Sequence, residues 1–437
     1  MDVNNSTVSG NIRAVVDLLR QGGIYDPAEL AAENVDTPDI SQHVILIHGD
    51  LGTGERLQAV QLRCSIEATP WDCFQHVVFI PGLFHLKMAC AEAIWRCFIQ
   101  PPAAREDETC LIHDVALLRP KETGIYCLKP GFRQTHQLIG HAGICQRLDC
   151  WRVHVKLKRF ASLEAYAASE LTLDDLKAMT DEVTQTYIAN YQLRYMKKRP
   201  EKDHNLQFEN AVLMNRYFLL YEELSYAMNH GDIGCVKTCT VHWIPILKAV
   251  GKHKYATQMT NFLINVHFIY PLVIDGLTRH AVRYHWLVNP TGQAMKWRAV
   301  DWCMELNNLF TKVKNGRKGS NHTVERILLE SLLVQAYRNV QAMIQKNFLH
   351  THLSIKHTNP NMMKSFQGLV TRLETHSPHV ITVGRKSRHK IIDLMDKGRE
   401  LMHKATRGDV EGDDQAAESE VGDELAVGMD DVLVELF

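Results

Sequence analysis

The strongest constraint on the fold comes from two short apolar runs, each followed by glycine and then by helical periodicity. The first run, HVILIH at residues 43–48, precedes Gly49 and a helical pattern over 55–67. The second, HVVFI at 76–80, precedes Pro81 and Gly82 and a helical pattern over 84–97. Short continuous apolar runs are typical of strands buried on both faces, and strands that alternate with helices favour a parallel sheet. We therefore expect a short, mainly parallel sheet whose strand C-termini carry any active-site residues.

Helical patterns dominate the rest of the chain. They cover 4–22 and then 206–230, 240–250, 256–269, 300–314 and 323–347, with Pro245, Pro271 and Pro290 between them, and a last basic helix is expected over 387–403. Thr172 with Asp175 predicts a capping box, and Gly231 is a C-terminal helix signal. The segment 103–150 is predicted to be mixed and rich in loops. The fold class that follows is an α/β N-terminal part before a large, mostly α-helical part, helix-dominated overall.

Charge divides the chain. Residues 409–437 hold 11 acidic residues and no Lys or Arg, so the 49 Lys and Arg residues of the chain face only 39 acidic residues in 1–408, a net charge of +10. A basic body with an acidic, disordered tail is expected. The predicted domains are an N-terminal helix and linker (1–42), a main domain (43–405, with an α/β part to 160 and a mainly helical part from 161) and the tail (406–437).

Cysteine usage and the N-terminus indicate an intracellular protein, nuclear or cytoplasmic. The 11 cysteines are odd in number, and no basic stretch followed by an apolar run marks a signal peptide. The longest uncharged stretch, 255–274, contains six polar residues and a proline besides. Burying so many polar groups in hydrocarbon is costly, so we interpret it as a pair of core helices and expect no membrane partner. The oligomeric state is left open.

The segment GDLGTGER at 49–56 is similar to a phosphate-binding loop but lacks its chemistry. The P-loop pattern requires a lysine and then a hydroxyl residue, whereas Glu55 and Arg56 stand at those positions. The preceding VILIHG also resembles the oxyanion-hole strand of α/β-hydrolases, but no serine elbow follows. An enzyme that binds an anion at the 49–54 turn remains one alternative.

Three carboxylates form the main candidate site. Asp50 follows the first predicted strand, where α/β folds place active residues, and Asp301 and Glu305 lie four residues apart on one helix face. Such carboxylates suit Mg²⁺ or Mn²⁺, which stabilise both oxygens of a phosphoryl transfer. Asp50 and Glu305 are the candidate metal ligands, and Asp301 is a further candidate catalytic residue. Helix capping by Asp50 and Asp301 is the competing interpretation.

Other groups have weaker chemical signals. Cys235, Cys239 and His242, and the set His136, His141, Cys145 and Cys150, have metal-like spacing, but zinc is not expected because neither offers four ligands in close pairs. Basic segments suggest a nucleic-acid partner. The candidate contacts are Lys197, Lys198, Arg199, Arg317, Lys318, Arg385, Lys386, Arg388 and Lys390.

Several long motifs resemble fungal members of domain of unknown function 6589. These are HVILIHGDLGTGERLQ, TPWDCFQHVVFIPGLFHLKMACAEAIWR, KPGFRQTHQLIGHAGICQRLDCW and the later AVDWCMELNN, so the resemblance covers about 43–350. It implies a mobile-element origin and a core similar to transposases of the ribonuclease-H-like fold, with Asp50 in the family's Gly-Asp motif and Glu305 as its helical acid. Many relatives have an acid where this chain has Leu83, and an upstream Asp-Asn strand is absent here.

Besides the anion-binding enzyme, two function classes follow. The first is a mobile-element-derived, nuclease-like protein, whose activity is left open because its key acids are incomplete and the chain is expected to be a truncated or decayed product. If active, it performs metal-dependent phosphoryl transfer on DNA. The second is a non-enzymatic module that binds nucleic acid or protein. The first requires Asp50 and Glu305 to meet at one site.

Overall fold

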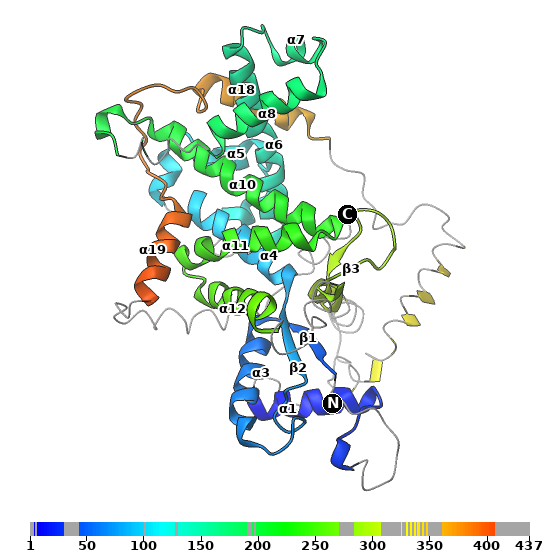
Figure 1. Ribbon diagram of the computed structural model, residues 1–437. Coiled ribbons are helices and arrows are strands. Elements are labelled where there is room, and N and C mark those ends of the chain that lie inside the picture. The colour runs from blue at the N-terminus through cyan, green and yellow to red at the C-terminus, as the bar shows by residue number, and fades with distance from the viewer. Residues whose placement is uncertain are drawn as a thin grey trace.

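The computed structural model describes residues 7–29, 43–99, 102–126, 130–189, 198–270, 284–306 and 361–406, with isolated positions elsewhere. A small lobe holds the sheet, and a larger helical body lies above it (Figure 1). The predicted tail and most of the predicted helix 323–347 lie outside the described residues.

The small lobe confirms the expected parallel strand pair. Strand β1 (Ile45–Gly49) pairs in parallel with β2 (Val77–Pro81), with Gly49 opposite Pro81. Helices α1 (Val8–Gln21) and α3 (Leu51–Arg63) pack together beside the strands, and the short 3-10 helix η2 (Cys64–Ile66) follows α3. Among the described residues no third strand joins this sheet.

The glycine-rich segment 49–54 is a helix start rather than the predicted turn. Helix α3 begins at Leu51, and the Asp50 carboxylate accepts a hydrogen bond from the Thr53 N–H at 2.7 Å. A Cβ on Gly54 would lie 2.3 Å from the Phe79 ring. The glycine therefore permits close contact between α3 and β2 and has no need of a bound phosphate.

The helical body is built around α4 (Leu83–Phe98), which follows β2 directly. The helices after it are α5 (Leu111–Leu118), α6 (Phe132–Leu157), α7 (Leu163–Ala167), α8 (Leu173–Tyr187), α10 (Leu206–His230), α11 (Ile233–Ala249), α12 (His253–Ile264) and a π-helical turn, η6 (Asn265–Ile269). Short 3-10 turns are η3 (Pro102–Glu106), η4 (Thr123–Tyr126) and η5 (Glu201–Asp203). The capping box of Thr172 and Asp175 is confirmed, as is the left-handed Gly231 after α10.

The prediction of a loop-rich segment over 103–150 is wrong, because α5 and most of the 26-residue α6 lie there. The sequence analysis predicted loops because α6 contains Gly140 and Gly143, and glycine weakens an isolated helix. A Cβ on Gly143 would lie 2.3 Å from Oε1 of Glu222 on α10. Close packing of α6 against α10 therefore explains Gly143.

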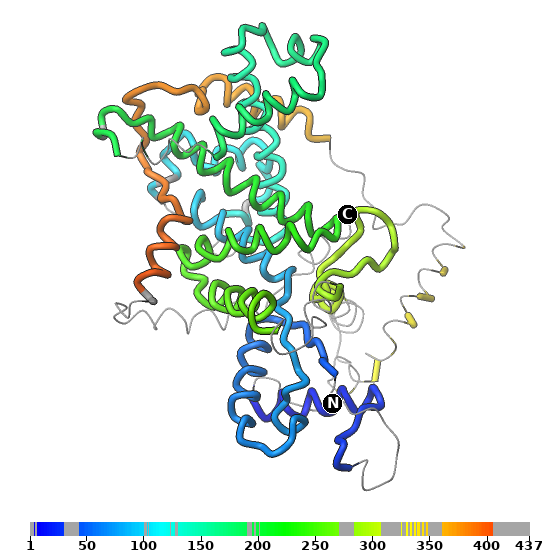
Figure 2. The backbone as a smooth tube through the Cα atoms, viewed as in Figure 1, coloured from blue at the N-terminus to red at the C-terminus, as the bar shows by residue number. Residues whose placement is uncertain are grey.

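The C-terminal helices belong to the same body. Figure 2 shows them, in orange and red, beside segments from the middle of the chain. Helix α18 (Met363–His376) was not expected, and α19 (Leu394–Thr406) begins seven residues later than predicted. Pro245 does not separate two helices as expected but lies inside α11. A Cβ on Gly398 of α19 would lie 1.8 Å from the Pro245 carbonyl oxygen, so α19 packs directly on α11 there.

One hydrophobic cluster connects the sheet with the helical body. It includes Ile80 of β2, Phe84 of α4, Trp243 of α11 and Leu369 of α18, all fully or almost fully buried. A two-stranded hairpin, β3 (Leu287–Val288) and β4 (Arg298–Ala299), leads into the helical residues 300–306. Within the described ranges, no helix is long and apolar enough to cross a bilayer.

Candidate functional site

The candidate site lies where both parallel strands end. Strand β1 stops at Gly49 before Asp50, and β2 stops at Pro81 before Gly82 and α4. The helical residues 300–306 bring Asp301 and Glu305 to this edge from more than 200 positions away in the sequence. We call Asp50, Asp301 and Glu305 the acid cluster.

Asp301 caps a helix, but not its own. Its Oδ1 accepts a hydrogen bond from the Phe84 N–H and its Oδ2 one from the His85 N–H, both at 3.1 Å. Helix α4 has no capping side chain at Gly82, the residue before it. The buried carboxylate of Asp301 therefore satisfies the free N–H groups and the positive dipole at the start of α4.

Gly82 is required for this contact. A Cβ at this position would lie 2.3 Å from Oδ2 of Asp301. The Pro81 carbonyl next to it accepts a hydrogen bond from Nε1 of Trp286 at 2.8 Å. The end of β2 is thus held by residues on both sides of the β3–β4 hairpin.

His85 connects the three acids electrostatically. Its Nδ1 lies 3.0 Å from Oδ2 of Asp301. Burial alone favours the neutral ring, but the hydrogen bond and charge of Asp301 and the charges of Glu305 and Asp50 outweigh it and raise the pKa of His85. Carboxylates from two separate segments, the start of α3 and the helical residues 300–306, therefore act on one imidazole.

His48 has the opposite behaviour. Burial lowers its pKa to about 4, with the negative charge of Asp301 opposing and the nearby His285 reinforcing the change. The His48 ring is therefore neutral at pH 7 and keeps a lone pair for a hydrogen bond or a metal. Sequence reasoning missed His48, His85 and His285, although the first two adjoin the C-terminal ends of the predicted strands.

The three acids differ in how many of their carboxylate oxygens already accept hydrogen bonds. Both oxygens of Asp301 accept hydrogen bonds, while Asp50 uses Oδ1 for the Thr53 N–H. Glu305 is half-buried and makes no hydrogen bond or ion pair with the described part of the chain. Within that part, no group of three or more His, Cys, Asp or Glu residues is placed to hold a metal ion. Two hard carboxylates nevertheless suit Mg²⁺ or Mn²⁺, since Mg²⁺ commonly binds one or two carboxylates and retains water.

Comparison with known proteins identifies the family. The model of a family of unknown function (DUF6589) matches residues 1–357. The chain belongs to this family. No curated protein and no solved structure gives a significant match. The DUF6589 match includes the whole acid cluster and ends before α18 and α19.

The cysteine and histidine groups of this DUF6589 chain do not converge. Nδ1 of His136 lies 2.8 Å from the Tyr221 hydroxyl, and Nδ1 of His141 lies 3.1 Å from the Arg119 guanidinium. In the other group, Cys235 contacts Glu223 and His242 contacts a carbonyl of its own helix. Each group therefore has local structural partners.

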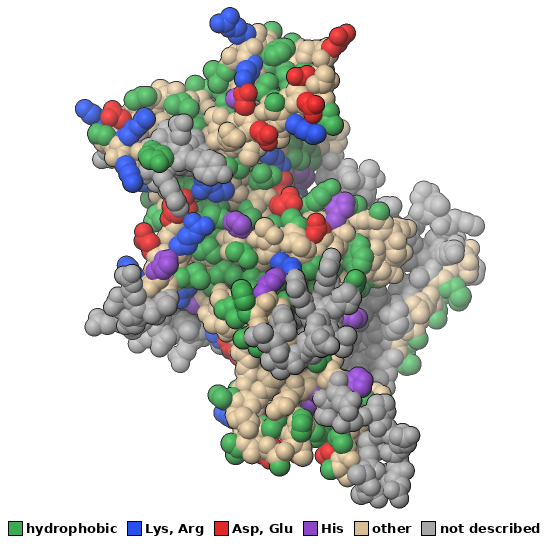
Figure 3. Space-filling model, viewed as in Figure 1, with side chains coloured by type: hydrophobic (Ala, Val, Ile, Leu, Met, Phe, Trp, Pro, Cys, Tyr) green, Lys and Arg blue, Asp and Glu red, His purple; other side chains and the backbone are tan. Residues whose placement is uncertain are grey.

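The candidate nucleic-acid contacts are scattered, and Lys197, Arg317 and Lys318 lie outside the described residues. Arg385 donates hydrogen bonds to the His376 and Ser377 carbonyls at the end of α18 and is only partly exposed. Arg388 pairs with Glu106 at 3.2 Å. The remaining four, all exposed, are Lys198, Arg199, Lys386 and Lys390. Figure 3 shows basic and acidic side chains interspersed over the helical body on the face in view.

Proposed function

We propose that this protein has a mobile-element-derived, nuclease-like core that performs divalent-metal-dependent phosphoryl transfer on DNA at the acid cluster. The observation that supports this most is the action of Asp50, Asp301 and Glu305 on the single imidazole of His85. Carboxylates at the C-terminal end of parallel strands and on a crossing helix are suited to two-metal phosphoryl transfer.

Each residue has a distinct part in this proposal. Asp50 and Glu305 would hold Mg²⁺ or Mn²⁺, which when bound neutralises charge on a transferring phosphoryl group. Asp301 is a positioning residue, because it fixes the start of α4 and the charge of His85. When it is protonated, His85 offsets part of the negative charge of the cluster, which otherwise would repel a phosphate backbone.

Leu83 limits the ligand set. Its side chain is only 1% exposed and belongs to the main hydrophobic cluster. The position at which the family resemblance implies an acid therefore contributes to packing in this chain. Asp50 and Glu305 remain as ligands, together with the neutral ring of His48.

A cleavage assay on DNA hairpins and ends, with and without Mg²⁺ or Mn²⁺, tests the proposal. Asp50→Asn is the sharpest variant, because asparagine caps a helix as well as aspartate does but carries no charge. Asp50→Asn and Glu305→Gln should each reduce cleavage at least about a hundredfold, whereas Glu67→Gln at an exposed site should not. Metal-independent cleavage, or equal activity in wild type and Asp50→Asn, would contradict catalysis here.

A non-enzymatic nucleic-acid-binding module is the second candidate. Two observations favour it. Both oxygens of Asp301 already accept hydrogen bonds, and no group of three potential metal ligands occurs in the described ranges. It predicts DNA binding that weakens steeply with salt and is the same in wild type and Asp50→Asn. Binding unchanged between low and moderate salt would count against it.

A further inference from the structure

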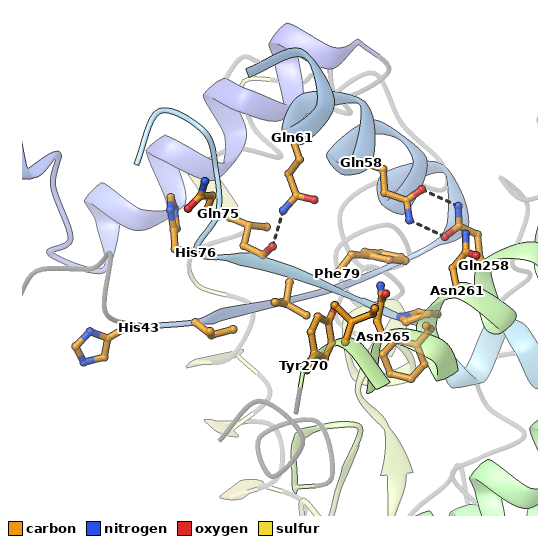
Figure 4. Close-up of a pocket in the computed structure, with 16 residues that line it drawn as sticks. His43, Gln58, Gln61, Gln75, His76, Phe79, Gln258, Asn261, Asn265 and Tyr270 are labelled. Atoms are coloured by element: carbon orange, nitrogen blue, oxygen red, sulfur yellow. Dashed lines mark hydrogen bonds between the residues drawn. The ribbon is translucent and has the colours of Figure 1, made fainter. Parts of the chain in front are cut away.

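A cavity of about 800 Å³ lies along β2. Its walls come from β2, the residues just before β1, α3, and the end of α12 with the π-helical η6 (Figure 4). Six carboxamide side chains line it: Gln58, Gln61, Gln75, Gln258, Asn261 and Asn265. We call this cavity the amide pocket. Its volume lies within the usual range for small-molecule sites.

The pocket combines these amides with aromatic faces and has no charged lining. Phe79, Phe262 and Tyr270 contribute rings, and no Asp, Glu, Lys or Arg among the described residues lines the cavity. Burial lowers the pKa of His76, with only partial opposition from the Pro70 carbonyl, and raises the pKa of the Tyr270 hydroxyl. Both groups are neutral at pH 7. No carboxylate, lysine or arginine of this lining therefore offers a counter-charge to a charged ligand such as a free phosphate.

Some of these carboxamides already make hydrogen bonds within the protein. The others can bind a ligand. Gln58 and Gln258 hydrogen-bond reciprocally, with both N–O distances at 3.1 Å, and so join α3 to α12. Gln61 donates to the Phe74 and Val77 carbonyls, and its own oxygen has no partner in the described chain. Asn261 is exposed, and its carboxamide makes no hydrogen bond to any described residue. Donors and acceptors are therefore free at the pocket.

The π-helical turn shapes this wall. Residues five apart point to different faces of an α-helix, whereas the i→i+5 hydrogen bonding of a π-helix places them together. Asn265 and Tyr270 are five apart, and their side chains hydrogen-bond to each other beside the pocket. Such turns are rare and occur frequently at functional sites.

We propose that the amide pocket binds one unstacked nucleobase. A base is planar, uncharged and rimmed by adjacent donors and acceptors, which carboxamides match in pairs, and its faces stack on aromatic rings. The pocket is also next to the acid cluster, because Pro81 lines it and the following Gly82 contacts Asp301. A nucleic-acid strand as the source of the base rests on the proposed function, but recognition of the base does not require a metal.

Fluorescence anisotropy with a short labelled single-stranded DNA, in EDTA, tests this binding apart from any cleavage. Wild type should bind a strand with bases about tenfold more tightly than an otherwise identical abasic strand, as loss of stacking and edge contacts predicts. Free nucleosides at millimolar concentration should compete if the base alone suffices. If they do not compete, the strand supplies part of the affinity and the preference over the abasic strand still supports the pocket.

Asn261→Ala should remove most of the preference for the base-containing strand without affecting folding, because this side chain has no partner in the described chain. Gln367→Ala, at another exposed helical carboxamide on α18, should keep the preference. Equal affinity for both strands in wild type, equal effects of the two variants, or competition by an uncharged disaccharide would overturn the proposal. None of these outcomes depends on activity at Asp50.

Discussion

Oδ2 of Asp301 lies 3.0 Å from Nδ1 of His85 and also accepts the backbone N–H of that residue. The buried Asp301 carboxylate therefore caps α4 and also raises the pKa of His85. The charges of Glu305 and Asp50 raise the same pKa. Removing a partner from a buried charged pair costs much more than the pair contributes, because the remaining group is left without compensation.

Asp301→Asn should lower the pKa of His85. The variant removes the charge of Asp301, the partner that raises this pKa most, while burial continues to favour the neutral ring. The raised pKa in the wild type stabilises the fold fully below pH 6.5, and this contribution is lost as pH rises through the folded-state value. NMR titration of the imidazole measures the change, and Glu67→Gln is a control. An unaltered pKa of His85 in Asp301→Asn would show that the contact with Asp301 does not raise it.

Gly82→Ala should destabilise the protein by about 1–3 kcal/mol, the usual cost of an overpacked site, because the new Cβ would lie 2.3 Å from the Asp301 carboxylate. Gly140→Ala is the matched control. Its Cβ meets nothing within 4 Å on α6, so it should stabilise the helix by about 0.5–1 kcal/mol. Urea denaturation measures both changes. Equal effects would indicate that Gly82 tolerates a side chain.

Local patterns were sufficient to predict the two strands of the parallel pair and several helix ends. Strands β1 and β2 follow from continuous apolar runs, and the caps at Thr172 and Gly231 follow from side-chain and backbone chemistry within a few residues. The sequence also predicted Asp50 as a helix cap or a site residue, and it has the first role in the structure.

Long-range packing could not be predicted in the same way. The glycines of α6 and α3 indicated turns, but close approach of Glu222 and Phe79 explains Gly143 and Gly54. Helix capping was one of two interpretations of Asp301, but the helix that it caps is α4, across 217 positions of sequence. No local pattern encodes either contact, so the site histidines and the amide pocket become visible only in the folded chain.

Gly398→Ala should destabilise the packing of α19 on α11 by about 1–3 kcal/mol, because the new Cβ would lie 1.8 Å from the Pro245 carbonyl oxygen. Both helices belong to one core, although α19 lies beyond the residues that the family model matches. Thermal unfolding monitored by circular dichroism should show a single transition at lower temperature. Gly384→Ala is not a suitable control, because the φ of Gly384 is +78° and alanine would be strained there. Gly140→Ala is therefore the control here as well. An unchanged midpoint would mean that α19 can move away at little cost.

His379 and Asp149 should give the protein a stability that declines in alkaline solution. Nδ1 of His379 lies 2.7 Å from Oδ2 of Asp149, and neither side chain is exposed. Burial favours the neutral ring, but the sulfur of Cys150 and the Asp149 carboxylate raise the pKa of His379 to about 10 from 6.5. Because the folded state holds the proton more tightly, this stabilisation is complete below pH 6.5 and is lost as pH rises towards 10.

The protonated ring also needs an acceptor at Nε2. The Asn215 carboxamide lies 3.1 Å from that atom and offers its oxygen after a 180° rotation. His379→Ala should therefore cost about 3–5 kcal/mol at pH 6, since it leaves the buried Asp149 carboxylate with Arg152 as its one remaining charged partner among the described residues. The difference from wild type should shrink by pH 10. His376→Ala, at a partly exposed residue 3.6 Å from Glu108, should cost less than about 1 kcal/mol. Denaturant unfolding at pH 6, 8 and 10 measures these differences, and a gap that stays constant across the series would rule out a protonated His379.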